Sequence, residues 1–178
     1  PIFSGFRREH LPILPQEFRL VPRQVREGKA YKDDPGVVRQ LGVIRDLFDR
    51  CESIIVATDA GREGELIFRY VYNYLGCTKP FARLWISSLT DKAIREGLQN
   101  LREGSLYDNL YLSAKARSEA DWLVGINSSQ ALSLAAGQGV FSLGRVQTPT
   151  LAMICSRYRE NRQFEPRTYF RIKVSAAK

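Results

Sequence analysis

The spacing of apolar positions predicts helices and strands that alternate through the first hundred residues. Apolar residues three and four apart predict an amphipathic helix over 37–51, and the apolar run 53–57 predicts a buried strand. A second helix is predicted from Arg62 to Leu75, with Gly76 as its stop.

A second strand is predicted over 81–86, followed by a helix over 91–101 that Thr90 caps. This alternation predicts a parallel sheet with helical crossovers. Two strands are too few for a stable sheet alone, so we expect missing sequence upstream. The chain begins at Pro1 without Met, which also suggests a fragment.

Strand signals disappear after a boundary loop expected at 102–109. A long helix with small residues on its apolar stripe is predicted over 110–137, and the Gly-Gln-Gly sequence that starts at Gly137 breaks it. Next come a turn over 142–147 and a helix over 150–159, with Pro149 in its first turn. Alternation after Gln163 predicts the start of another strand.

Residues 1–36 are rich in Arg and Pro and are predicted to be irregular. Within them, residues 11–20 alternate apolar groups with prolines, which exclude a regular helix. We expect an extended arm that packs across a neighbouring element.

The charge indicates a polyanionic partner. The 178 residues contain 27 Lys and Arg against 19 Asp and Glu, a formal net charge of +8. Nucleic acid is the first candidate and an anionic membrane the second. No apolar run reaches the length of a membrane span, and no secretory signal opens the chain.

Cysteine and histidine contribute little candidate chemistry. The three cysteines are far apart in the sequence and suggest reduced thiols in a cytosolic protein rather than a zinc site. The one histidine, His10, has no visible partner for a nucleophile scheme.

Two acids follow the first predicted strand. Asp59 leaves the strand tip, and Glu63 lies in the first turn of the next helix. Two carboxylates about 5 Å apart repel by roughly 3 kcal/mol at an effective dielectric constant near 20. A hard cation such as Mg²⁺ would offset this repulsion. Alternatively, the acids only complement the helix dipole, and the spacing alone favours that interpretation.

The string ATDAGREGELIFR, residues 57–69, resembles the acidic motif of the Toprim domain in type IA DNA topoisomerases, in their topoisomerase III branch. The usual pattern is Asp-x-Asp-x-Glu-Gly, and Gly61 stands where the second Asp is expected. The resemblance implies that Asp59 and Glu63 bind Mg²⁺, with Glu63 as the Toprim acid and Glu65 nearby. Gly61 leaves the number of ions open.

Arg117 and Asp121 are four residues apart on a predicted helix, so they can form a surface ion pair. The surrounding string ARSEADWLVGIN resembles the start of the helical domain beside Toprim in the same family. That resemblance implies that Arg117 contacts phosphate of a single strand, with Ser118 and Asp121 beside it.

The stretch 141–150 has a Gly that permits close backbone approach and an Arg that can hold phosphate. A capped turn before a helix is the simpler interpretation of this stretch taken alone. It also resembles the S-x-G-R-V-Q signature of type IA topoisomerases, which lines their single-strand groove. The DNA-binding residues that this resemblance implies are Ser142, Leu143, Gly144, Arg145, Val146 and Gln147.

The resemblance covers nearly the whole chain and implies an α/β plus α fold. Residues 1–104 would form a Toprim domain, a Rossmann-like parallel sheet lacking its first strand. Residues 105–163 would form the helical domain, and 164–178 the first strand of a β-rich gate domain.

Type IA enzymes cut one DNA strand with a tyrosine that precedes Pro-Arg-Thr. Here Glu165 precedes that tripeptide, so the catalytic tyrosine is expected outside the chain. We therefore expect part of an ATP-independent enzyme that relaxes or decatenates DNA, with Mg²⁺ and single-stranded DNA bound and no cleavage by this piece alone.

The expected location is the cytoplasm, with the nucleoid, and a helicase is a further partner that the family allows. Two other functions stay open. One is a stand-alone single-stranded nucleic-acid-binding module, and the other is a different Toprim nuclease or phosphotransferase. The string ARSEADWLVGIN and the S-x-G-R-V-Q signature argue against a different Toprim nuclease or phosphotransferase.

Overall fold

The computed structural model describes residues 7–176, which divide into two compact units. The sheet unit is Leu14–Leu123. The tail unit consists of two segments, Pro1–Ile13 and Val124–Lys178. Each unit is described by itself below.

The sheet unit begins with a short hairpin that the sequence analysis did not predict. Strands β1 (Gln24–Glu27) and β2 (Ala30–Asp33) pair antiparallel, where an irregular segment was expected. Gly28, in the turn, adopts the left-handed φ of 64° that glycine permits. All eight strand residues are exposed, so neither strand has the alternation of buried and exposed positions on which strand prediction depends.

The predicted β-α-β unit is present. Helix α1 (Pro35–Arg50) leads to β3 (Ile54–Val56), and helix α2 (Arg62–Tyr74) connects β3 to β4 (Phe81–Arg83). Strands β3 and β4 are parallel, with Ile54 opposite Phe81. The sequence prediction is confirmed for this unit.

The third strand departs from prediction. Strand β5 (Arg102–Glu103) pairs antiparallel with β4, so the small sheet, of order β3-β4-β5, is mixed. A loop was expected at 102–109, because a strand of only two residues is too short to show an alternation of apolar and polar positions. Helix α3 (Asp91–Gln99) precedes this strand, and the 3-10 turn η2 (Gly104–Tyr107) follows it. Thr90 caps α3 as predicted, accepting a hydrogen bond from the Ala93 amide at 3.3 Å.

An aromatic cluster forms the centre of the sheet unit. The Phe81 ring lies 4.9 Å from that of Phe68 and 5.3 Å from that of Tyr72. At Gly104 an added Cβ would lie 2.2 Å from the Phe81 ring, so only glycine fits there. This packing holds α2 and the chain after β5 against the sheet.

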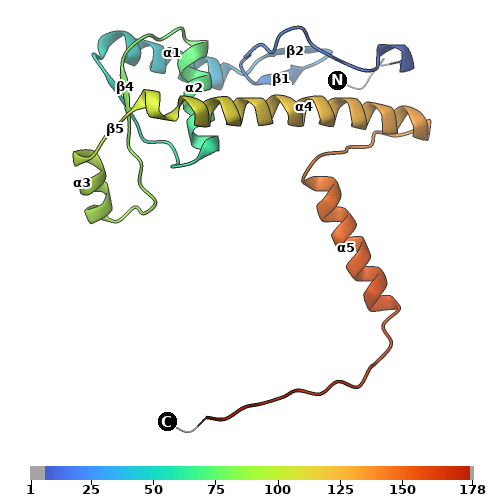
Figure 1. The fold of residues 1–178 in the computed structure, drawn as a ribbon. Coiled ribbons are helices and arrows are strands. Elements are labelled where there is room, and N and C mark those ends of the chain that lie inside the picture. The colour runs from blue at the N-terminus through green and yellow to red at the C-terminus, as the bar shows by residue number, and fades with distance from the viewer. Residues whose placement is uncertain (1–6, 177–178) are drawn as a thin grey trace. The chain divides into compact units, whose positions relative to one another are not determined.

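Helix α4 (Asp108–Ala136) is a continuous helix of 29 residues, close to the predicted span (Figure 1). Its residues up to Leu123 belong to the sheet unit and the rest to the tail unit. Gly137 and Gly139, with φ of 72° and 80°, end it where the sequence indicated. None of the helices among residues 7–176 is both long and apolar enough to span a membrane.

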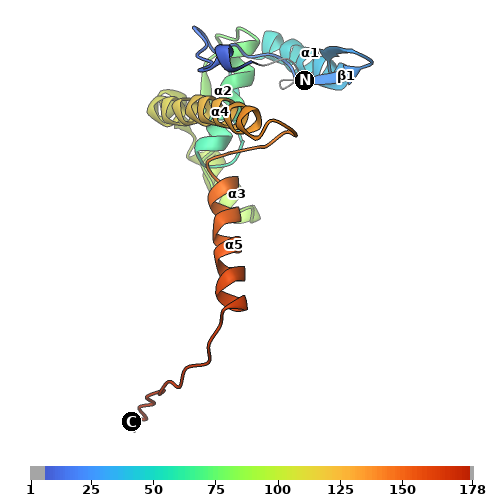
Figure 2. The same cartoon turned by 90° about the vertical axis from the view of Figure 1, so that its right-hand side faces the viewer.

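In the tail unit, helix α5 (Gln147–Arg162) follows the loop after α4 (Figure 2). Pro149 lies in its first turn, as predicted. Residues 164–176 form neither helix nor strand, so the strand predicted there is not formed. A strand requires a hydrogen-bonding partner, and these residues find none in the described part of the chain.

Candidate functional site

The turn after β3 presents Asp59. Asp59 is an exposed residue, and its backbone carbonyl takes part in hydrogen bonds within the protein. That carbonyl accepts hydrogen bonds from Nη2 of Arg83 at 2.7 Å and from the Gly61 amide at 2.8 Å. Two hydrogen bonds to its carbonyl oxygen therefore hold the backbone of Asp59 in place.

Close packing joins this turn to the start of α2. A Cβ added at Gly64 would lie 2.1 Å from the Asp59 carbonyl oxygen, so no larger residue fits there without movement of the backbone. The Thr58 hydroxyl donates a hydrogen bond to the Gly64 carbonyl at 2.7 Å. This contact explains why glycine directly follows Glu63: it lets the acid-bearing helix turn approach the strand end.

Glu63 and Arg117, 54 positions apart in the sequence, meet in the sheet unit. Oε1 of Glu63 lies 3.4 Å from Nη1 of Arg117. The Glu63 side chain is 68% exposed and that of Arg117 is 38% exposed, so solvent and ligands can reach both. Arg117 Nε also lies 3.9 Å from Asp121, the looser of its two acidic contacts. The structure thus brings a predicted metal-binding acid beside a predicted phosphate-binding base.

The turn after β3 and the first turn of α2 each carry one acid of the predicted cation site. Among residues 7–176, no group of three or more His, Cys, Asp or Glu side chains is placed to hold a metal ion. Asp59 and Glu63 are the two acids that the sequence analysis assigned to Mg²⁺, an ion that commonly binds through one or two carboxylates together with water and phosphate oxygens. At Gly61 the backbone is extended, and nothing lies within 4 Å of an added Cβ.

Glu65 does not belong to this set, although it was expected beside the ion. Its side chain is fully buried and forms two ion pairs, with Nε of Arg69 and Nε of Arg83, each at 2.8 Å. Helical geometry explains the difference, because residues two apart lie on different faces of a helix. The sequence analysis missed Arg83, although a charged residue in an apolar strand signals a buried partner.

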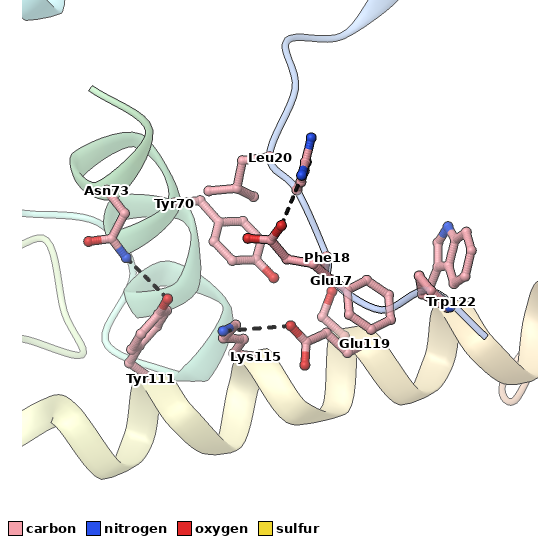
Figure 3. A pocket seen from close by; sticks show the side chains of 12 residues that line it. Glu17, Phe18, Leu20, Tyr70, Asn73, Tyr111, Lys115, Glu119 and Trp122 are labelled. Carbon is pink, nitrogen blue, oxygen red and sulfur yellow. Dashed lines mark hydrogen bonds and ion pairs between the residues drawn. The ribbon is translucent and has the colours of Figure 1, made fainter. Parts of the chain in front are cut away.

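Ser118 lines a cavity of the sheet unit between the N-terminal arm, α2 and α4 (Figure 3). The cavity measures about 490 Å³, and its walls combine aromatic rings with Lys115 and Glu119. Phe18 of the arm packs edge-to-face against Trp122 at 5.5 Å, which confirms that the arm crosses a neighbouring element. Tyr70 and Tyr111 also line this cavity, and the sequence analysis did not nominate them.

The loop 141–147 is fastened to α4 inside the tail unit. The buried Ser129 hydroxyl accepts a hydrogen bond from the Leu143 amide at 2.9 Å and donates one to its carbonyl at 3.2 Å. Gly144 donates to Thr148 Oγ1 at 3.1 Å, and Ser142 donates to Gln147 Oε1 at 3.2 Å.

These contacts join polar groups of the loop to α4 and α5, and the side chains of Arg145 and Val146 are exposed. The predicted DNA-binding residues of this motif thus form one ordered loop.

Two family comparisons match successive parts of the chain. Residues 24–89 match the Toprim domain, and residues 105–178 match a family described as DNA topoisomerase. Together these matches cover the turn with Asp59 and Glu63, Arg117 and the loop 141–147.

Relatives of known name are similar over nearly the whole chain. DNA topoisomerase 3 of Bacillus subtilis (strain 168) is 46% identical over 173 residues, and that of Bacillus licheniformis is 44% identical over 173 residues. The Staphylococcus aureus (strain USA300) DNA topoisomerase 3 is 44% identical over 170 residues. These alignments include 96–97% of this chain but only 22% of each relative. The chain spans about a fifth of the length of these relatives.

Proposed function

The chain belongs to the type IA DNA topoisomerase family, in its topoisomerase III branch, and from this premise we propose that it supplies the Mg²⁺ and single-strand DNA contacts of such an enzyme. The whole enzyme would cleave, pass and religate single-stranded DNA, and so relax or decatenate DNA. We propose that it acts in the cytoplasm in association with the nucleoid. We also propose a helicase as a partner.

The contact between Glu63 and Arg117 carries this proposal. A carboxylate that can hold a cation lies 3.4 Å from a guanidinium that can hold phosphate. Both kinds of group are needed where one sugar-phosphate chain is to be gripped and positioned. When bound, the ion would neutralise and orient the scissile phosphate.

The chain's own residues have separate roles in this proposal. Asp59 and Glu63 hold the cation. Arg117 contacts a phosphate, with Ser118 and Asp121 beside it. The loop that is fastened through Ser129 binds the strand by a charge and several neutral groups. These loop residues are Ser142, Leu143, Gly144, Arg145, Val146 and Gln147.

The nucleophile is proposed to lie outside these residues. Glu165 occupies the position before Pro-Arg-Thr where the family has tyrosine. The proposed division keeps 1–104 as a Rossmann-like Toprim domain, 105–163 as the helical domain and 164–178 as the start of the gate. In that proposal, a gate strand at 164–178 pairs with partners outside the chain.

A binding module without chemistry is the second candidate. The net charge of +8 and the proposed absence of the nucleophile favour it. A different Toprim nuclease or phosphotransferase is less consistent with the match of 105–178 to the topoisomerase family. A Tyr-Pro-Arg-Thr sequence in the following domain of the same reading frame would decide for the topoisomerase.

Binding of single-stranded DNA across a salt series tests the proposal. Each lost phosphate contact lowers the slope of log K against log salt by about 0.7 for single strands. We expect this flattening for Arg117→Ala and for Arg145→Ala, and tighter binding in Mg²⁺ that Glu63→Gln abolishes. The matched control is Arg95→Ala, on an exposed position of α3. Unchanged slopes in both variants, together with no effect of Mg²⁺, would refute the proposed function.

A further inference from the structure

Arg83 is a fully buried guanidinium on β4. A charge in the interior is strongly destabilising unless it is paired and its donors are satisfied. Its Nε lies 2.8 Å from Oε2 of Glu65, which is also fully buried. The two charges compensate one another as an ion pair in which neither of these two atoms makes a hydrogen bond, and the terminal nitrogens of the guanidinium have other partners.

Both terminal nitrogens donate to the end of β3 or to the turn that carries Asp59. Nη1 donates to the carbonyls of Val56 at 3.1 Å and Thr58 at 2.9 Å, and Nη2 donates to the carbonyl of Asp59 at 2.7 Å. One rigid, planar group thus holds the last residue of β3 and two residues of the turn that follows it. A lysine, with a single flexible ammonium, cannot make the same set of contacts.

Glu65 connects this arrangement to α2. It lies in the first turn of the helix, two residues after Glu63, and its other oxygen pairs with Arg69 at 2.8 Å. Arg69 in turn donates to the Gly104 carbonyl at 3.1 Å and pairs with Asp108 at 2.5 Å. The helix turn that bears Glu63 is therefore held to the same guanidinium that fixes the backbone of Asp59.

Stability alone does not explain this pair. Apolar residues of similar volume often stabilise a protein as well as a buried ion pair does, or better. Its contacts also join the Asp59 carbonyl, through Arg83, to Glu65 in the helix turn that bears Glu63.

We propose that Arg83 and Glu65 are positioning residues for the divalent-cation site, holding the backbones of Asp59 and Glu63 in the arrangement that binds the ion. This inference deepens the proposed function and rests on it. Neither residue touches the ion. Residues that orient metal ligands in this way commonly change metal affinity 10- to 100-fold when replaced.

The test is Arg83→Lys, which keeps a positive charge beside Glu65 and loses the fork to the three carbonyls. We expect the dissociation constant for Mn²⁺, measured by electron paramagnetic resonance, to rise at least tenfold. In the metal-free protein, we expect faster hydrogen exchange at the Gly61 amide, which donates to the Asp59 carbonyl. The melting temperature and the exchange of the α4 amides should stay near those of the wild type. Arg95→Lys, the same change on an exposed position, is the control and should alter none of these values.

A second variant covers the case in which Arg83→Lys unfolds the protein. Glu65→Met with Arg83→Met removes both charges, fills similar volume and is expected to fold. If either folded variant binds Mn²⁺ as tightly as the wild type, with unchanged Gly61 exchange, the positioning role is refuted.

Failure of the proposed function looks different. In that case the wild-type protein would bind no Mn²⁺, or would bind it equally well after Asp59→Asn or Glu63→Gln. The Gly61 exchange in metal-free protein would still report whether Arg83 holds the turn, so unchanged exchange refutes the positioning role there too.

Discussion

Single residues set the chemistry of the turn after β3. Gly64 is required because any side chain would collide with the Asp59 carbonyl, whereas Gly61 has open space around its Cβ and an extended backbone. The two glycines look alike in the sequence, yet the structure constrains only one of them. Lack of space therefore does not explain why position 61 holds glycine rather than aspartate.

Gly61→Asp should strengthen Mg²⁺ binding about tenfold, equivalent to about 1.4 kcal/mol, because a third carboxylate raises the charge of the site. The affinity can be measured by titration calorimetry. Gly61→Asn, of equal size and without charge, is the comparison and should gain much less. An equal gain in both variants would mean that charge is not the cause.

Asp34 gives a pH-dependent prediction at the same scale. Hydrogen bonds from the Arg23 side chain and from the Gly36 amide lower the pKa of Asp34 below its ordinary value. Its ionised form is thus favoured in the folded state, and it stabilises the protein above the unfolded pKa of about 3.9. This contribution is lost as the pH falls through the lowered folded pKa.

Melting curves of wild type and Asp34→Asn should therefore differ at pH 7 and begin to converge as the pH falls below about 4, since about 3.9 is the unfolded pKa. Asn keeps the helix cap, so this difference isolates the charge. Asp34→Ala also loses the cap of α1 and should melt lower than Asp34→Asn at both pH values. A gap between wild type and Asp34→Asn that widens on acidification would contradict the assignment.

At the scale of elements, the second half of α4 organises the loop 141–147. Ser129 is buried and makes two hydrogen bonds to Leu143, and Ser133 makes the same pair of bonds to Phe141 from a partly exposed position. Two serines, one helical turn apart, therefore hold two loop residues that are separated by one position.

Ser129→Ala should cost about 1 kcal/mol or more in local stability, because it leaves the part-buried Leu143 amide without its acceptor. Single-stranded DNA binding should weaken as the loop loses order, and hydrogen exchange at Leu143 should quicken. Ser133→Ala is the matched variant, and its effect should be smaller because water can replace the lost bonds. Equal effects of the two variants, or none, would show that burial of Ser129 is not what orders the loop.

For the molecule as a whole, the prediction concerns the proposal that these residues do not include the nucleophile. Incubation with single-stranded DNA and Mg²⁺ should give no covalent protein–DNA adduct after denaturation. Gel analysis of 5′- and 3′-labelled DNA detects such an adduct. A 5′-phosphotyrosyl bond formed by these 178 residues would overturn the prediction.

The amino-acid sequence by itself determined the helices, the parallel pair β3 and β4, and the motifs, because periodicity, caps and breakers act within a few residues. It did not reveal the β1–β2 hairpin or β5, whose short strands exist only through pairing. Only the tertiary structure decided that Glu65 is buried with Arg83 and that Glu63 faces Arg117. Those partners lie 18 and 54 positions apart in the chain, counting from 65 to 83 and from 63 to 117, and local patterns carry no information about contacts at such separations.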